Sequence, residues 1–124
     1  MYGTIKRCKW LGLLFLCIVL LTGCAAEKSN AVPQFASQEQ LDSHYQKHVI
    51  EQKEFGNISK QEYLKRAQTL VTSPPGDSIL TKTRSNGDRL YYNKTTNEFA
   101  AVTKDGIIKT FFKPKDGIDY FNKQ

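Results

Sequence analysis

The chain contains two histidines, His44 and His48, which are four residues apart. On a helix, this spacing places both imidazoles on the same face. Histidine titrates near neutral pH, so the pair could exchange protons with a substrate as a general acid and a general base. A structural role is the alternative that the spacing by itself favours, with one ring beside Leu41 and Tyr45 and the other in solvent.

A zinc site is a third interpretation of the histidine pair. Two histidines at this spacing bind zinc in metalloproteases, but there a glutamate follows the first histidine, and here Tyr45 stands in that position. No obvious third ligand lies nearby in the sequence. We therefore expect no metal and no other cofactor.

Cleavage of RNA without a metal would use a base for the 2′-hydroxyl, an acid for the leaving oxygen, and cations or hydroxyls to stabilise the phosphorane. The second half of the chain supplies suitable types, namely Arg84, Arg89, Tyr91, Tyr92, Lys109, Thr110 and Lys113. Any basic domain of this size offers a similar set. Residue types alone therefore do not establish the activity.

Thr110 is the hydroxyl whose position is most informative. In a strand over residues 107–113, side chains alternate, so Thr110 would share a face with Ile108 and Phe112. A hydroxyl between two large apolar residues could satisfy a buried backbone group. Alternatively, it could lie at the rim of a cleft between the sheet and the first helix and act on a substrate there.

Two helices are expected to position the histidines. Ser37 with Gln40 and Ser59 with Glu62 both have the spacing of a capping box. Apolar residues at helical spacing then predict a first helix over about 38–53 and a second that ends before the prolines of residues 72–77.

After residue 78 the pattern changes to short runs of β-branched and aromatic residues, at 79–84, 89–93, 98–103 and 107–112. Turn-forming residues separate the runs, which predicts consecutive hairpins. The expected fold class is therefore α+β, with two N-terminal helices followed by a four-stranded antiparallel β-meander.

The N-terminus resembles a bacterial lipoprotein signal. Basic residues precede an apolar run over 11–21, and Leu21-Thr22-Gly23-Cys24 resembles a lipobox. The resemblance implies cleavage before Cys24, acyl chains such as palmitate on this residue, and an extracytoplasmic, lipid-anchored protein. An uncleaved anchor helix is the alternative. We expect three regions: a signal peptide (1–23), the lipidated Cys24 with a flexible tether (24–36), and a small α+β domain (37–124).

Composition limits what the mature chain could be. Removing residues 1–23 from the 124 leaves 101, enough for one small domain. Of these, residues 78–124 hold nine basic and five acidic side chains, a balance that suits phosphates, RNA or an anionic membrane, or simply solubility. Cys8 and Cys17 leave with the signal and Cys24 takes the lipid, so no thiol remains for a disulfide or a nucleophile.

A family resemblance joins these features. Six blocks occur in one order, at residues 44–48 (HYQKH), 54–56 (EFG), 62–63 (EY), 84–88 (RSNGD), 96–99 (TNEF) and 105–114 (DGIIKTFFKP). Together they resemble the pyocin large subunit-like C-terminal domains of polymorphic bacterial toxins. That family is grouped with metal-independent ribonucleases of the barnase, EndoU, colicin and RelE type.

The resemblance implies a ribonuclease in which His44 and His48 form the acid–base pair and Arg84 binds phosphate. Thr110 and Lys113 would then stabilise the transition state. The implied partners are RNA, the membrane through the lipid on Cys24, and a cognate immunity or surface protein. Such toxin domains usually end a long delivery protein, whereas this one follows a lipid anchor. A non-catalytic surface-binding, exclusion or immunity lipoprotein is therefore the alternative.

Overall fold

The computed structural model describes residues 31–124. The predicted signal peptide and Cys24 lie outside the described residues. Within them, Val32–Gln124 form one compact unit. In this part of the chain, no helix is both long enough and apolar enough to cross a membrane.

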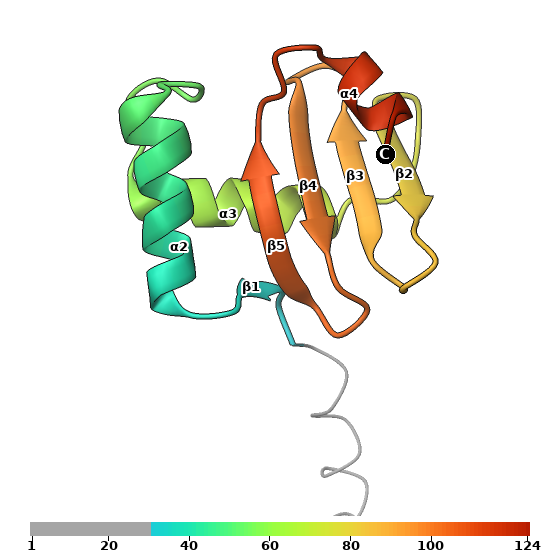
Figure 1. The fold of residues 1–124 in the computed structure, drawn as a ribbon, viewed down its shortest axis with the longest axis horizontal. Coiled ribbons are helices and arrows are strands. Elements are labelled where there is room, and N and C mark those ends of the chain that lie inside the picture. The colour runs from blue at the N-terminus through green and yellow to red at the C-terminus, as the bar shows by residue number, and fades with distance from the viewer. Residues whose placement is uncertain (1–30) are drawn as a thin grey trace, which may run out of the picture. The chain divides into compact units, whose positions relative to one another are not determined.

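A five-stranded sheet organises the domain, in the order β1-β5-β4-β3-β2 (Figure 1). Its strands are β1 (Gln34–Phe35), β2 (Ile79–Thr83), β3 (Arg89–Asn93), β4 (Glu98–Val102) and β5 (Ile107–Phe112). The helices are α2 (Gln38–Tyr45), its π-helical continuation η2 (Gln46–Glu51), α3 (Lys60–Val71) and α4 (Ile118–Asn122). In Figure 1, α3 crosses behind the sheet and α2 lies beside the edge formed by β1 and β5.

Both long helices begin where their sequences predict. The Ser37 hydroxyl accepts a hydrogen bond from the Gln40 amide at 3.2 Å, and the Ser59 hydroxyl accepts one from the Glu62 amide at 3.1 Å. Each bond satisfies a backbone donor that has no partner within its helix. The predicted starts of both helices, at Ser37 and Ser59, are confirmed.

The first helix does not stay α-helical. From Gln46 to Glu51 it widens into a π-helix, in which the Gln52 amide donates to the carbonyl of Lys47. Such segments are rare, and they often occur at functional sites. His44 therefore lies in α2, whereas His48 lies in η2.

The expected fold class is wrong in its sheet and in its helices. The sheet has five strands and is mixed, because β1 pairs in parallel with β5 through Gln34 and Ile107 and through Phe35 and Ile108. The helical part is α2 with η2, then α3, and a further helix, α4, follows the sheet. A strand of two residues directly after a proline has no period to detect, and these residues lie in the segment expected as a tether.

Two apolar clusters hold the sheet, one on each face. The cluster under α3 contains fully buried Tyr63, Ala67 and Phe111. The cluster under α4 contains Leu90, Phe99 and Phe121 with its neighbours. Because α3 and α4 cover different faces, the ends of β4 and β5 are fixed from both sides.

Candidate active site

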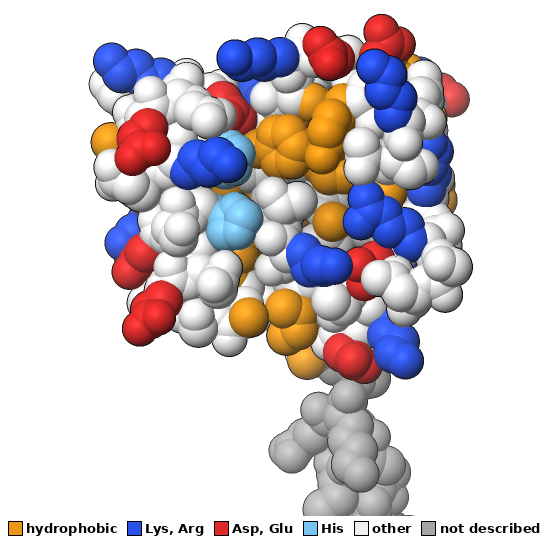
Figure 2. Space-filling model, viewed as in Figure 1, with side chains coloured by type: hydrophobic (Ala, Val, Ile, Leu, Met, Phe, Trp, Pro, Cys, Tyr) orange, Lys and Arg blue, Asp and Glu red, His pale blue; other side chains and the backbone are white. Residues whose placement is uncertain are grey.

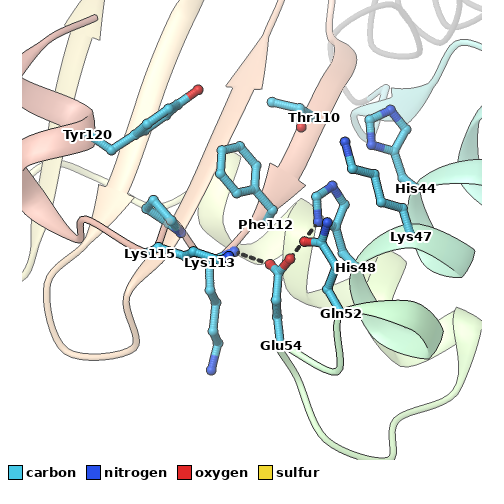
Figure 3. A pocket seen from close by; sticks show the side chains of 11 residues that line it. His44, Lys47, His48, Gln52, Glu54, Thr110, Phe112, Lys113, Lys115 and Tyr120 are labelled. Carbon is cyan, nitrogen blue, oxygen red and sulfur yellow. Dashed lines mark hydrogen bonds and ion pairs between the residues drawn. The ribbon is translucent and has the colours of Figure 1, made fainter.

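A pocket of about 580 Å³ lies between the α2–η2 segment and the end of β5 (Figure 3). Polar, cationic and aromatic side chains from several elements share its wall. They are His44, Lys47, His48, Gln52, Glu54, Thr110, Phe112, Lys113, Pro114, Lys115 and Tyr120.

A β-bulge in β5 turns part of this wall toward the pocket. Ala101 pairs with Thr110, but the next residue of β4, Val102, pairs with Ile108, so Lys109 is the extra residue. Ile108 consequently packs into the cluster under α3, while Thr110 lines the pocket. The prediction that these two side chains share a face is wrong, because a bulge interrupts the alternation on which it was based.

His48 is the most precisely held residue of the pocket. The residue is 6% exposed, and its Nδ1 lies 2.8 Å from Oε2 of Glu54. The other carboxylate oxygen of Glu54 accepts a hydrogen bond from the Lys113 amide at 2.7 Å. Because a carboxylate can only accept, Nδ1 of His48 must carry the proton, which leaves Nε2 free to accept one.

The turn after η2 makes this pairing geometrically accessible. The Glu54 amide donates to the carbonyl of His48 at 2.9 Å, and Lys53 has a φ of 54°. A left-handed residue at this point reverses the chain at the end of the helix. Glu54 is thereby brought back beside the imidazole six residues earlier.

His44 lies next to His48 in a less polar environment. Its ring centroid is 6.0 Å from that of His48 and 5.2 Å from that of Phe35. Its Nδ1 is buried and finds no hydrogen-bond partner among the described residues. Burial lowers the pKa of His44, and Lys47, together with His48 whenever His48 is protonated, lowers it further. His44 is thus kept neutral, with the remaining proton favoured on Nε2, because an unpaired acceptor costs less than an unpaired donor.

Cationic side chains surround the pocket. Lys47 extends from η2, and Lys113 and Lys115 follow the end of β5. The ammonium of Lys113 lies over the ring of Phe55, 5.3 Å from its centroid. Lys113 therefore contributes its backbone amide to Glu54 and its charge to the rim, rather than a side chain inside the pocket.

The structure brings together four of the five residues predicted for catalysis, namely His44, His48, Thr110 and Lys113. Arg84 does not line the pocket. Its Nη2 donates to the side-chain oxygen of Gln124 at 2.9 Å, and its backbone closes the turn before β3. The predicted lipidation site, Cys24, lies outside the described residues.

Sequence reasoning missed Glu54 and Lys47 as site residues. Both lie in the blocks that carried the family resemblance, yet nothing in their spacing shows that one of them reaches His48. Phe112 and Tyr120 pack against the cluster under α4. Each is partly exposed and lines the pocket.

Across residues 31–124, no group of three or more His, Cys, Asp or Glu side chains is placed to hold a metal ion. His48 and Glu54 bind each other instead.

Comparison with known proteins assigns the chain to a family. Residues 34–123 match the family described as "Uncharacterised protein aq_aa01". The chain belongs to this family. Its description names neither a toxin domain nor a lipoprotein, so both remain predictions.

No curated protein sequence matches the chain. Among solved structures, it is similar to a chain from "Ribonuclease from Escherichia coli complexed with its inhibtor protein". The identity is 19% and the TM-score is 0.43, over 67% of this chain and 96% of that chain. A TM-score of this size does not establish a shared activity.

Proposed function

We propose that the chain is a ribonuclease that cleaves RNA without a metal, with its active site in the pocket beside His44 and His48. The observation that carries the proposal is the pair formed by His48 and Glu54, with Nδ1 and Oε2 2.8 Å apart. A carboxylate that fixes the tautomer of an imidazole leaves the other ring nitrogen as a proton acceptor. This is the role that activation of an RNA 2′-hydroxyl needs.

In the first half of the reaction, Nε2 of His48 removes the proton of the 2′-hydroxyl. The 2′-oxygen then attacks the adjacent phosphorus, and a P–O bond forms. Glu54 stabilises the imidazolium that results, because it is already hydrogen-bonded to Nδ1. The same carboxylate is fixed from its other side by the Lys113 amide, so the imidazole does not turn away.

The pentacovalent phosphorane carries negative charge on its non-bridging oxygens. A neutral His44 offers its Nε2–H as a donor, and Thr110 offers a hydroxyl on the facing strand. Preorganised donors of this kind are among the largest contributions to catalysis.

In the second half, the P–O5′ bond breaks and the departing oxygen takes a proton from the ammonium of Lys47. Lys47 is close enough for its charge to lower the pKa of His44. The products are a 2′,3′-cyclic phosphate and a 5′-hydroxyl. Lys47 then regains its proton from water, and the imidazolium of His48 gives its proton to the hydroxide that this leaves.

Cleavage of a short RNA by the purified full chain, in excess chelator, tests the proposal. We expect a 2′,3′-cyclic phosphate product, and we expect no cleavage where the attacking nucleotide is 2′-deoxy. His48→Asn should abolish the activity, since Asn places no acceptor at the position of Nε2. Lys94→Ala is the matched control, because Lys94 is exposed in the turn between β3 and β4.

Intact RNA in the presence of the folded full chain would contradict the proposal. It would favour the alternative, a non-catalytic binding protein. Cleavage of the 2′-deoxy substrate would also contradict it, because the mechanism depends on the 2′-hydroxyl.

A further inference from the structure

We propose that Phe112 and Tyr120 form a subsite on which a nucleobase of single-stranded RNA stacks beside the phosphate to be cleaved. The inference rests on the proposed ribonuclease function and specifies the substrate as an unpaired strand. Its support is the geometry of the aromatic wall next to the two histidines.

The two rings are held rigidly. Phe112 lies nearly parallel to the ring of His48, with centroids 5.3 Å apart and an interplanar angle of 19°. Tyr120 meets Phe112 edge-on at 5.3 Å and 79°, and both rings contact buried Phe99. β5 supplies Phe112 and α4 supplies Tyr120, so two elements are needed to build this wall.

Part of this aromatic surface faces solvent. Phe112 and Tyr120 are partly exposed, whereas Phe99 beneath them is 1% exposed. Figure 2 shows an apolar area of the surface directly beside the histidines, with basic side chains around it. Large aromatic rings left open on a pocket wall are available to bind a flat apolar ligand.

The positive charge around the pocket favours flat ligands that are also anionic. Lys47, Lys113 and Lys115 border the same pocket, so a ligand that is flat and also carries negative charge fits best. A nucleotide in a single strand has both properties, because its base presents a π-face and its phosphate an anionic group. Aromatic platforms with adjacent cations bind single strands in this way, largely without regard to sequence.

The position of the platform gives it a direct link to the reaction. The ring of His48 stacks on Phe112, so a base on the aromatic wall places its own sugar and phosphate next to the catalytic imidazole. A duplex would keep its bases stacked on each other, and they could not reach the platform. We therefore expect a strong preference for unpaired RNA.

Binding of a 2′-O-methyl oligonucleotide, which cannot be cleaved, tests the subsite independently of catalysis. Its affinity for the full chain is measured by fluorescence anisotropy, next to strands that carry one abasic nucleotide at successive positions. Base stacking on an aromatic ring typically changes affinity by about 5- to 150-fold. We expect a loss in this range when the abasic position falls on the platform.

Tyr120→Leu and Phe112→Leu should weaken binding of the intact strand by a similar factor, while Tyr120→Phe retains it. The leucine variants keep an apolar side chain over Phe99, and circular dichroism verifies their fold. With the abasic strand, Tyr120→Leu and the unsubstituted chain should bind equally. Equal affinity for intact and abasic strands, or unchanged binding by both leucine variants, would overturn the subsite.

Failure of the subsite and failure of the ribonuclease give different results. Base-dependent binding without any cleavage of RNA would support the platform and refute the activity. Cleavage that proceeds equally well on intact and abasic strands would support the activity and refute the platform.

Discussion

His48 and Glu54 are joined through Nδ1 and Oε2 at 2.8 Å, and the second oxygen of the same carboxylate accepts the Lys113 amide at 2.7 Å. One side chain thus links the π-helix to the segment that follows β5. The imidazole and the strand end are held together at the pocket, which fixes the distance between the helix side and the sheet side of the site.

Glu54→Gln should lower the rate of RNA cleavage by roughly 10²- to 10⁴-fold, as expected when a carboxylate that orients a catalytic imidazole is lost. The glutamine oxygen can still accept the Lys113 amide, so its NH₂ faces Nδ1 of His48. That contact favours the tautomer with the proton on Nε2, which cannot act as a base. The check is the single-turnover rate of cleavage by Glu54→Gln, measured next to that of the control variant Lys94→Ala. An unchanged rate in Glu54→Gln would remove Glu54 from the mechanism.

The lowered pKa of His44 predicts how stability depends on pH. Since the folded chain resists protonation of His44, this residue contributes stability above its unfolded pKa of about 6.5, which is lost as the pH falls toward its lower folded value. His44→Gln should therefore reduce the loss of stability between pH 7.5 and pH 5. The free energy of unfolding of both proteins is measured by urea titration at pH 7.5 and at pH 5. A larger loss in the variant would contradict the assignment.

Tyr63→Phe should lower the free energy of unfolding by about 1–2 kcal/mol. The Tyr63 hydroxyl donates to the carbonyl of Phe111, and the side chain is fully buried between α3 and β5, so the substitution removes a buried hydrogen bond. Tyr45→Phe is the matched comparison, because the Tyr45 hydroxyl donates to the Ile58 carbonyl nearer the surface. We expect the smaller loss there, and denaturant titration compares the two.

Phe35→Ala should cost about 3–5 kcal/mol of stability, the usual range for truncation of a buried phenylalanine. It also removes the ring that covers His44, with centroids 5.2 Å apart. The pKa of His44 should consequently rise toward its ordinary value, which NMR titration would detect. Phe35→Leu should retain most of both properties. An unshifted His44 in the alanine variant would show that Phe35 does not cause its desolvation.

The lipid anchor remains a proposal from the sequence. We expect Cys24 to carry diacylglycerol and the chain to fractionate with membranes when it is expressed in a bacterium. Metabolic labelling with an alkyne fatty acid should mark the chain, while Cys24→Ala should not be marked. Labelling that persists in the variant would place the lipid elsewhere.

Strand positions were predictable because apolar alternation and turn residues report on them directly. The runs expected at 79–84, 89–93, 98–103 and 107–112 lie within one residue of β2 to β5. The fold class was nevertheless wrong, because β1 is too short to leave a pattern. Its only detectable residue was Phe35, which looked like part of a tether.

The site was predictable in its residue types and not in its geometry. Apolar residues three or four apart predict an ordinary α-helix with 3.6 residues per turn. Neither the π-helix nor the return of Glu54 to His48 follows from that spacing. The bulge at Lys109 likewise reverses the alternation of β5 without any glycine or proline to mark it. Arg84 was offered by its residue type and given the phosphate-binding role by resemblance, whereas its contact with Gln124 joins residues that are 40 apart in the sequence.

The parallel pairing of β1 with the start of β5 also determines where a fusion partner or a solid support would be attached relative to the pocket. The chain enters the domain at Gln34, beside Ile107, whereas the aromatic wall begins at Phe112, five residues along the strand and roughly 16 Å away. A purification tag, a fluorescent protein or a solid support joined before Val32 would therefore leave from the opposite end of β5. Fusions at this end should keep the pocket accessible.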